Sequence, residues 1–307
     1  MLFQERTFIP VPPGARRGFD HADVYAPALG ESRLYAAHTG ADSVDVFDCA
    51  REAYLRRLLG HPGVAGVLID SARDLLLTSD RGCGRLSVYR CSDESLVGQV
   101  EVGARPNGIA FDPVRRSAYA FNLGEPIGHD CTASVVSLDE MEVVTTIPLP
   151  GRPRWAIYDP ERDCVFANIR EPSEIIVLDA QTQKAIGAFD VPATGPHGLT
   201  LAAGQLICAA DGGKVVALDR NGGHVVGTAD VPGEPDVVMY DADADQLFVA
   251  VGDPGIVVLI ERATLQPIGT LATEQGAHTI AWDPGTRTLF AFLPTQCGVL
   301  AFAEMEA

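Results

Sequence analysis

The chain lacks the short motifs that identify many common enzymes. Its 307 residues contain no G-x-S-x-G nucleophile elbow, no P-loop and no G-x-G-x-x-G that opens a helix. The run Gly82-Cys83-Gly84 stands among strand-like segments and predicts a turn, not a dinucleotide site. These absences remove the sequence support for an α/β-hydrolase, a P-loop nucleotide hydrolase or a Rossmann dehydrogenase.

Basic residues are scarce. Lysine and arginine together number 23 against 41 aspartates and glutamates, which leaves a formal net charge of −18. A surface this acidic repels nucleic acid and anionic membranes, so we expect neither as a partner. The charge fits ordinary solubility or an acidic surface on which another molecule docks.

Long hydrophobic runs are also absent. No apolar stretch approaches the roughly 20 residues of a membrane span, and residues 1–6 lack the basic and apolar regions of a signal peptide. The seven cysteines are scattered, with no C-x-x-C pair, which favours reduced thiols. We therefore expect a cytoplasmic protein.

A degenerate repeat organises the whole sequence. Its template is the run Arg105-Pro106-Asn107-Gly108-Ile109-Ala110-Phe111-Asp112-Pro113, which recurs from Arg152, Glu234 and Gly276 and, more weakly, from Asp20, Val64 and Gly195. Alignment of the copies places His21, Ala65, Asn107, Arg154, His197, Asp236 and His278 in one column. The intervals between successive column residues are 44, 42, 47, 43, 39 and 42 residues. A period of about 40 to 45 residues with several strands per unit is typical of propeller blades.

Each unit is predicted to hold four strands, the first being the repeat run itself. The segments are rich in valine, isoleucine, threonine and aromatic residues and are bounded by turn-forming residues. The predicted second strands are 33–37, 74–78, 117–121, 164–168, 205–209, 246–251 and 288–292, and the third strands are 43–48, 86–90, 134–139, 174–179, 214–219, 255–261 and 298–304. Alternating fourth strands are recognised at 143–149, 185–191 and 225–231. No segment holds a sustained helical period, so the fold is predicted to be all-β.

The last unit has three strands before the sequence ends at Ala307. Residues 5–12 look like the fourth strand at 144–150, so we expect them to complete the seventh blade. Closure of the ring removes the large open sheet edge that would otherwise remain. The prediction is a single seven-bladed β-propeller over residues 1–307, with blades starting near residues 18, 62, 104, 151, 194, 233 and 275.

The repeat resembles that of a known family of propellers. A Pro-x-Gly-φ-x-φ-Asp-Pro run (φ is any apolar residue), an alternating strand and a strand ending in φ-Asp resemble the YVTN-type seven-bladed propellers over nearly the whole chain. Streptogramin lyases and some lactonases are similar in overall plan. The resemblance implies the fold, and it implies elimination or hydrolysis of a lactone or ester as candidate chemistry. No catalytic residue is carried over, because the match is architectural.

The column residues are expected at one mouth of the central channel, where the innermost strand of each blade starts. Blades four to seven and blade one are consecutive around the ring, so His197, Asp236, His278 and His21 are predicted to form one arc. Three imidazoles and a carboxylate suit a divalent transition metal, Zn²⁺, Fe²⁺, Mn²⁺ or Cu²⁺, better than calcium, which prefers oxygen ligands. A hydrogen-bonded polar plug around ordered water is the alternative.

The opposite arc is predicted to bind substrate. Arg154 offers a two-pronged donor for a carboxylate or phosphate, Asn107 offers an amide, and Ala65 leaves room. The other interpretation of Arg154 is a salt bridge to Asp236 or Asp159.

Two more histidines are candidate proton-transfer groups. His38 ends the second strand of blade one, beside His21, and is a candidate general base, a further metal ligand or a solvent-facing residue. His129 lies in the longest loop between second and third strands, residues 123–131, which predicts either a lid or an exposed insertion.

These observations predict a metal-dependent enzyme that acts on a small anionic substrate, of the lyase or lactone/ester hydrolase type. His21, His197 and His278 would hold the metal, with Asp236 as a fourth ligand or an orienting acceptor. Arg154 and Asn107 would anchor the substrate, and the predicted catalytic residues are His38, His129 and Arg154. The alternative is a non-catalytic propeller that binds a protein or a small ligand. The sequence indicates no particular oligomeric state.

Overall fold

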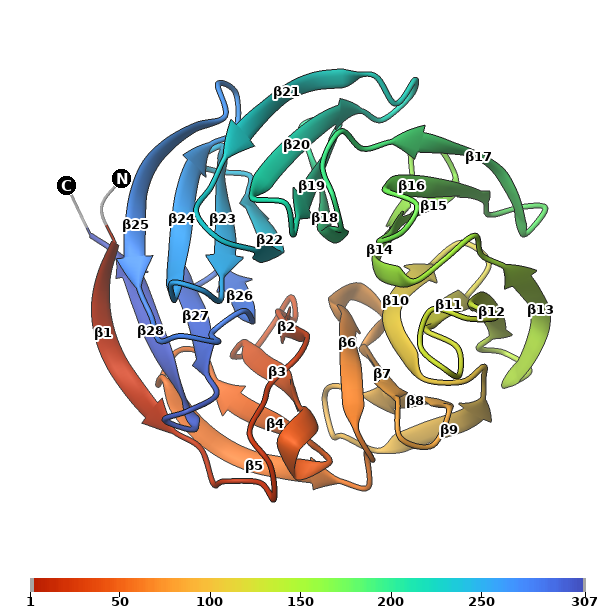
Figure 1. Ribbon diagram of the computed structural model, residues 1–307. Coiled ribbons are helices and arrows are strands. Elements are labelled where there is room, and N and C mark those ends of the chain that lie inside the picture. The colour runs from red at the N-terminus through yellow and green to blue at the C-terminus, as the bar shows by residue number, and fades with distance from the viewer. Residues whose placement is uncertain (1–2, 306–307) are drawn as a thin grey trace.

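Seven four-stranded sheets surround a central channel in the computed structural model, which describes residues 3–305 (Figure 1). Blade one holds β2 (Ala22–Tyr25), β3 (Arg33–His38), β4 (Ser43–Asp48) and β5 (Ala53–Leu59), and blade two holds β6 (Val64–Asp70), β7 (Leu75–Asp80), β8 (Arg85–Arg90) and β9 (Leu96–Glu101). Blade three holds β10 (Pro106–Asp112), β11 (Ser117–Asn122), β12 (Thr132–Ser137) and β13 (Glu142–Pro148), and blade four holds β14 (Pro153–Asp159), β15 (Cys164–Ile169), β16 (Glu174–Asp179) and β17 (Lys184–Asp190).

The remaining blades follow the same order from the channel outward. Blade five holds β18 (Pro196–Ala202), β19 (Gln205–Ala210), β20 (Lys214–Asp219) and β21 (Val225–Asp230), and blade six holds β22 (Pro235–Asp241), β23 (Gln246–Val251), β24 (Ile256–Glu261) and β25 (Gln266–Ala272). Blade seven holds β26 (Ile280–Asp283), β27 (Thr288–Leu293), β28 (Gly298–Glu304) and β1 (Phe3–Pro10). Two single 3-10 turns, η1 (Thr39–Ala41) and η2 (Ser71–Arg73), interrupt blades one and two. The predicted all-β, seven-bladed fold is confirmed.

The amino-terminal strand closes the ring. β1 pairs antiparallel with β28, for example Phe8 with Leu300 and Pro10 with Gly298. The two ends of the chain therefore lie side by side in blade seven (Figure 1). The predicted donation of this strand is confirmed, with β1 placed at Phe3–Pro10 instead of residues 5–12. Residues 1–2 and 306–307, which the predicted domain includes, lie outside the described residues.

The structure adds fourth strands to three blades. β5, β9 and β25 complete blades one, two and six, where the sequence showed no clear alternation. These outer strands have solvent on one side and few fully buried residues: in β25 six of the seven residues are exposed. An outer strand therefore has only a weak hydrophobic pattern from which to be recognised.

The hydrophobic core lies between neighbouring blades. One cluster joins Val215 of β20 to Val249 of β23, and another joins Leu77 of β7 to Ala120 of β11. The second and third strands of each blade are packed on both faces by adjacent blades, so nearly all their residues are buried. The result is a rigid ring from which the loops and strand ends project toward the channel.

The Asp-Pro motif of the repeat forms the turn after the inner strands β10, β14 and β26. Oδ1 of Asp112 accepts a hydrogen bond from the Val114 N–H at 2.8 Å, and Asp159 accepts one from the Glu161 N–H at 2.9 Å. Such aspartates fold back on their own backbone and stabilise tight turns. Within residues 3–305 no helix is long and apolar enough to cross a membrane, and all seven cysteines are free thiols.

Candidate functional site at the column mouth

The column residues converge at one mouth of the channel, which we call the column mouth. Ala65, Asn107, Arg154, His197 and Asp236 are each the second residue of an inner strand, while His21 directly precedes β2 and His278 stands shortly before β26. In all five inner strands that include a column residue, the register shifts between the first and fourth residues. Such bulges free a residue from the ladder and redirect its side chain.

Neighbouring blades touch through their backbones at this mouth. A Cβ atom on Gly108 would collide with the carbonyl oxygen of Arg154, and one on Gly198 with that of Asp236. The glycine that follows the column residue thus lets the next blade approach closely. Blade four carries Trp155 at this position instead, and its ring stacks on His21 with centroids 4.1 Å apart.

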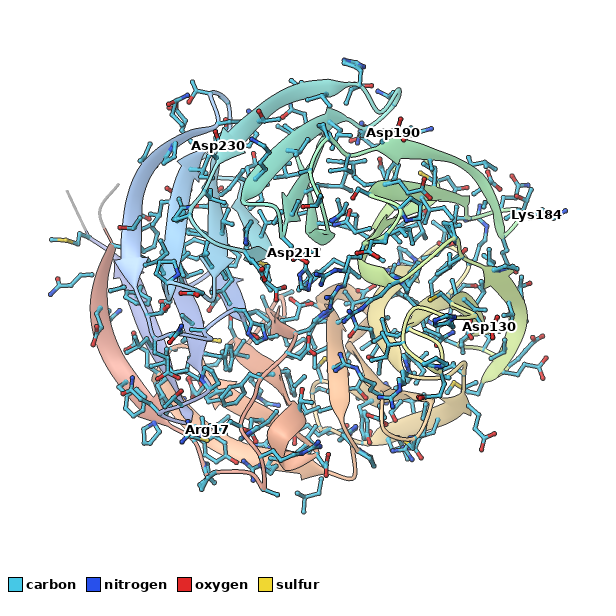
Figure 2. The ribbon with its side chains drawn as sticks, viewed as in Figure 1. Arg17, Asp130, Lys184, Asp190, Asp211 and Asp230 are labelled. Atoms are coloured by element: carbon cyan, nitrogen blue, oxygen red, sulfur yellow. The ribbon has the colours of Figure 1, made fainter. Side chains whose placement is uncertain are left out.

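His197 bridges two carboxylates. Its Nδ1 lies 2.9 Å from Oδ1 of Asp211, and its Nε2 lies 3.1 Å from Oδ1 of Asp236. A carboxylate only accepts hydrogen bonds, so Nδ1 of His197 donates to Asp211, while its Nε2 faces Asp236. Oδ2 of Asp211 also lies 2.8 Å from a terminal nitrogen of Arg170. A chain of close polar contacts from Arg170 through Asp211 and His197 to Asp236 therefore crosses blades four, five and six beside the channel, where Figure 2 shows Asp211.

Asp211 is stabilised as a carboxylate by these neighbours. Burial alone would raise its pKa, but the hydrogen bond from His197 and the charges of His197, Arg170 and Arg154 hold the pKa below its usual value. The Asp211 side chain therefore stays ionised and orients His197.

The other two column histidines differ in their protonation. Burial lowers the pKa of His278, but the charges of Asp236 and Asp20 outweigh it and raise the pKa above its usual value. Nδ1 of His278 donates to the Gly276 carbonyl at 2.8 Å. For His21 burial prevails over Asp20 and Asp236, and the pKa lies below its usual value. His278 is thus the more readily protonated of the two.

Two guanidinium groups at this mouth have no acidic partner within residues 3–305. Arg152 and Arg154 flank Pro153 at the start of β14, and the Nε atom of each is buried without a hydrogen-bond partner. Burial and the nearby Arg152 and Arg170 lower the pKa of Arg154 to about 10. The salt bridges to Asp236 or Asp159 that were considered from the sequence are not formed. Crowded, poorly solvated cations are costly, and an anion placed between them removes that cost.

Arg81 and Asn107 occupy the neighbouring part of the ring. Arg81 lies 2.9 Å from Oδ2 of Asp20 and also donates to the side-chain oxygen of Asn107. Asn107 is 3% exposed and Ala65 is fully buried. Asn107 is therefore engaged by Arg81 in this arrangement, and its predicted role in substrate binding stays a prediction.

A cavity of about 370 Å³ opens beside these groups. It is lined by Arg154, Arg170, His197, Asp211, Asp236 and His278, with further acidic and backbone groups from blades six and seven. A smaller hollow of about 200 Å³ shares Arg170 and adds Arg152 with Ile127 and Gly128 of the blade-three loop. The larger cavity brings Arg154 and His197 together, and the smaller hollow places Arg152 beside Arg170, which borders both.

The predicted metal ligands lie near one another but are already engaged. Within the described part of the chain, no group of three or more His, Cys, Asp or Glu side chains is arranged to hold a metal ion. Nδ1 of His197 donates to Asp211 and Nδ1 of His278 donates to the Gly276 carbonyl, so these two atoms do not offer free lone pairs. Nε2 of His197 faces Asp236 at 3.1 Å. The metal site at His21, His197, Asp236 and His278 stays a prediction.

His38 does not reach the column mouth. Its side chain is fully buried inside blade one, where Nδ1 lies 2.7 Å from Oδ2 of Asp45, and Asp45 pairs in turn with Arg57 at 2.8 Å. The equivalent positions of blades two and three also hold buried polar pairs, Asp80 with Ser87 and Asn122 with Ser134. This pattern gives His38 a structural place inside the blade. Its predicted catalytic role has no support from the geometry.

His129 is exposed on the loop between β11 and β12. The loop is held by hydrogen bonds from the Gly128 and His129 N–H groups to the Leu123 and Pro126 carbonyls. The loop residues that border the smaller hollow are Ile127 and Gly128, and His129 is not among them. The part of the loop that borders this hollow is therefore apolar. A proton-transfer role for His129 stays a prediction.

Sequence reasoning missed three residues of the mouth. Arg152 stands two positions before Arg154 in the repeat itself, so the motif contained its signal. Trp155 occupies a position that is glycine in three other copies, which also marked it as unusual. Arg81 carried no comparable signal, because its partners Asp20 and Asn107 belong to other blades.

Comparison with known proteins supports the fold. No family model and no curated protein matches the chain. Among solved structures, a chain of hydrazine synthase from Kuenenia stuttgartiensis is similar, with a TM-score of 0.80 and 13% sequence identity, over 94% of this chain and 96% of that one. Identity this low shows a shared fold and no more. The finer resemblance to YVTN-type propellers stays a prediction.

Proposed function

We propose that the column mouth binds a small anionic molecule and transfers protons to it, as an enzyme of the lyase or lactone/ester hydrolase type does. The observation that carries the proposal is the pair of guanidinium groups, Arg152 and Arg154, which have no acidic partner within residues 3–305. Arg154 lines the cavity of about 370 Å³ and Arg152 the hollow of about 200 Å³. A carboxylate or phosphate accepts two parallel hydrogen bonds from a guanidinium and neutralises its charge.

We assign proton transfer to His197, which Asp211 orients. Elimination needs a base that removes a proton beside the anionic group, and hydrolysis needs a base that activates water. His197 is held by Asp211 through Nδ1, and its Nε2 lies 3.1 Å from Oδ1 of Asp236 at the cavity. In the proposed elimination Nε2 of His197 takes the proton from carbon, and that electron pair forms the double bond as the C–O bond to the leaving group breaks. In hydrolysis Nε2 takes a proton from water as its oxygen attacks the carbonyl carbon, and the C–O bond to the leaving group then breaks. In both reactions His278, with its raised pKa, gives a proton to the leaving oxygen.

Anion binding is tested by calorimetry with acetate, succinate, citrate and inorganic phosphate. At least one of these probes should bind, and Arg154→Ala should weaken it about 30-fold or more, because truncating one partner of a close charge pair costs about 2 kcal/mol or more. Arg116→Ala is the matched control, since Arg116 forms an exposed ion pair with Asp139 at 2.6 Å. Equal binding by wild type and Arg154→Ala, or no binding at all, would overturn the proposal.

Catalysis is tested separately with panels of lactones, esters and hydroxy acids. Turnover should be lost in His197→Asn, while the binding of the anion persists. Anion binding without turnover of any compound would favour the non-catalytic alternative, in which the mouth only recognises its ligand.

A bound transition metal is a second candidate for the same mouth, favoured by the convergence of His197, Asp236 and His278 on one cavity. To hold an ion, His197 would exchange a carboxylate partner for the metal. Elemental analysis of tag-free protein purified without chelator, compared with His197→Ala/His278→Ala, decides this point. About one equivalent that is lost in the double variant supports the metal, and no metal after incubation with Zn²⁺, Fe²⁺, Mn²⁺ and Cu²⁺ rejects it.

A further inference from the structure

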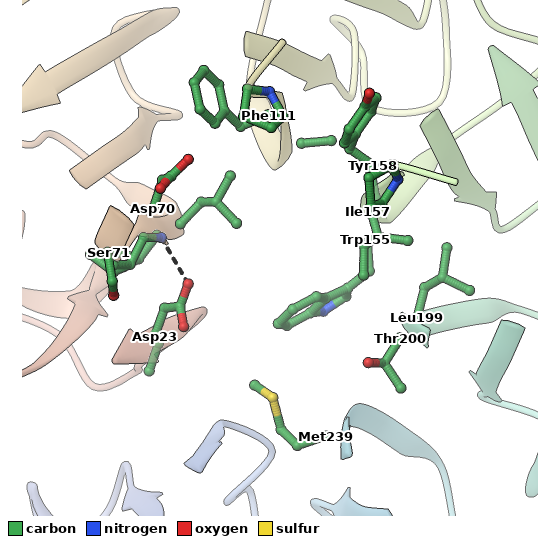
Figure 3. Close-up of a pocket in the computed structure, with 18 of the residues that line it drawn as sticks. Asp23, Asp70, Ser71, Phe111, Trp155, Ile157, Tyr158, Leu199, Thr200 and Met239 are labelled. Carbon is green, nitrogen blue, oxygen red and sulfur yellow. Dashed lines mark hydrogen bonds between the residues drawn. The ribbon is translucent and has the colours of Figure 1, made fainter. Parts of the chain in front are cut away.

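A second, larger cavity lies at the opposite end of the channel, which we call the turn mouth because the turns after the inner strands border it. Its volume is about 570 Å³. Its walls come from blades one to six, and the side chains that matter below are Asp23, Asp70, Phe111, Trp155, Tyr158 and Met239 (Figure 3). The volume falls within the range of roughly 300–1,000 Å³ that is typical of small-molecule sites.

The charged side chains that line this cavity are all acidic. No lysine, arginine or histidine lines it, whereas Asp23 and Asp70 do. Asp70 is neutralised by Arg73, whose terminal nitrogen lies 3.0 Å from its Oδ2. Asp23 has no cationic partner within residues 3–305, and its oxygens accept only the backbone N–H groups of Val24 and Ile69, each at 2.8 Å.

The wall across from Asp23 is apolar and aromatic. Trp155 projects into the cavity from β14, and Met239 of β22 lies beside it (Figure 3). The hydroxyl group of Tyr158 donates to Asp163 at 2.9 Å. Tyr158 therefore offers the cavity its aromatic ring, because its hydroxyl group is already hydrogen-bonded. An indole face attracts organic cations, and the apolar walls suit a hydrocarbon body.

We propose that the turn mouth binds a small organic amine in its protonated form. The ammonium group donates hydrogen bonds to the Asp23 carboxylate, and the apolar body packs against Trp155 and Met239. A carboxylate without a cationic partner in an apolar cavity disfavours anions and leaves a neutral ligand unable to offset its charge. A hydrated metal ion fits less well, because one carboxylate and apolar walls supply too few oxygen ligands. This site is separate from the anion site proposed at the column mouth.

The experiment compares ligands of one shape and different charge. Benzylamine, benzyl alcohol and benzoate are titrated into the full-length protein, with calorimetry and tryptophan fluorescence as readouts. Benzylamine should bind at least about tenfold more tightly than benzyl alcohol, because a hydrogen bond to a charged group is worth about 1.5–3 kcal/mol. Benzoate should not bind at this site. Equal affinity for benzylamine and benzyl alcohol, or no binding of benzylamine, would overturn the proposal.

Variants locate the site. Asp23→Asn should weaken benzylamine binding about tenfold or more, whereas Asp70→Asn, a second acidic residue of the same cavity that already pairs with Arg73, should change it little. Trp155→Phe should remove the fluorescence response and keep most of the affinity, which separates the signal of Trp155 from that of Trp282. If Asp23→Asn does not fold, the proposal is still tested by the affinities of the wild-type protein for benzylamine and benzyl alcohol. An unchanged affinity in folded Asp23→Asn would contradict the proposal.

Discussion

The two mouths of the channel are built from the same strands but have opposite chemistry. The column mouth presents arginines, histidines and aspartates from strand starts where the ladder is interrupted by bulges. The turn mouth presents apolar side chains from the following residues of the same strands, most of which lie in regular register, although Trp155 lies within the bulge of β14. It also presents Asp23, a carboxylate without a cationic partner within residues 3–305. The comparison shows how one repeat supplies two different sites: the bulge frees a polar residue at one end, and the regular pleat lines the other.

Trp155 separates the two mouths. It stacks on His21 toward the column mouth and lines the cavity of the turn mouth. It also packs against two of the hydrophobic clusters between blades. We infer that this side chain helps to keep the two sites apart, so Trp155 is the first residue to change when the two mouths are compared.

The largest effect is expected for Trp155→Ala. Loss of the ring should lower the free energy of unfolding by about 3 kcal/mol and connect the two cavities, because large-to-small changes leave a void. Urea denaturation measures the stability, and titrations with phosphate and benzylamine measure both sites. Trp282→Ala is the control: it should also destabilise the fold but leave ligand binding unchanged. If Trp155→Ala unfolded with the same free energy as the wild type, the indole ring would not be needed to fill the space between the two mouths.

The next largest effect is expected when His38, which is buried in blade one, is compared with His197 at the column mouth. His38→Ala should lower the free energy of unfolding by about 3 kcal/mol, since it removes one partner of a buried pair with Asp45. Binding at the column mouth should not change. His197→Ala should show the reverse, with a smaller loss of stability and a loss of proton transfer. A catalytic defect in folded His38→Ala would contradict the structural role assigned to His38.

The turn mouth should make stability depend on pH through Asp23. Burial raises the pKa of Asp23 to about 6, and only the two backbone N–H groups oppose it. The folded state then binds more protons than the unfolded state between the unfolded pKa of about 3.9 and the folded value, so stability falls as pH rises through this window. Denaturation at about pH 4 and pH 7 should show wild type losing about 2–3 kcal/mol relative to Asp23→Asn. An equal pH dependence of the two proteins would show that Asp23 is well solvated.

The smallest effect should appear at the column mouth, with anion binding that weakens as pH rises. The pKa of His278 is raised by Asp236 and Asp20 against the effect of burial, so its positive charge is lost only above the usual pKa of histidine. Loss of one nearby charge is worth about 1 kcal/mol, or about fivefold in affinity. His278→Asn should flatten the pH profile of phosphate binding, and His129→Ala, a change at an exposed loop, should not. Benzylamine binding should change in the opposite direction, rising with pH as Asp23 ionises.

Much of the fold could be predicted from local patterns. The spacing of Asn107, Arg154 and Asp236 within their copies fixed the period, and the likeness of residues 5–12 to residues 144–150 predicted the closing strand. The outer strands β5, β9 and β25 were harder, because one side of each faces solvent and the alternation is weak. The column residues also lie at one end of the channel, as the repeat predicted, since every inner strand starts at that end.

The sequence by itself therefore determined the all-β fold, the number of blades, the closing strand and the seven residues of the repeat column, because strand period and turn chemistry are local properties. Only the tertiary structure decided which partner each side chain has. It placed His197 between Asp211 and Asp236, left Arg152 and Arg154 without acidic partners among residues 3–305, and buried His38 against Asp45. It also joined Asp23 and Trp155 in one cavity. His38 and His197 each meet an aspartate of their own blade, whereas the contacts of His197 with Asp236 and of Asp23 with the cavity of Trp155 join different blades. Only the folded blades and the closed ring set the distances between these partners.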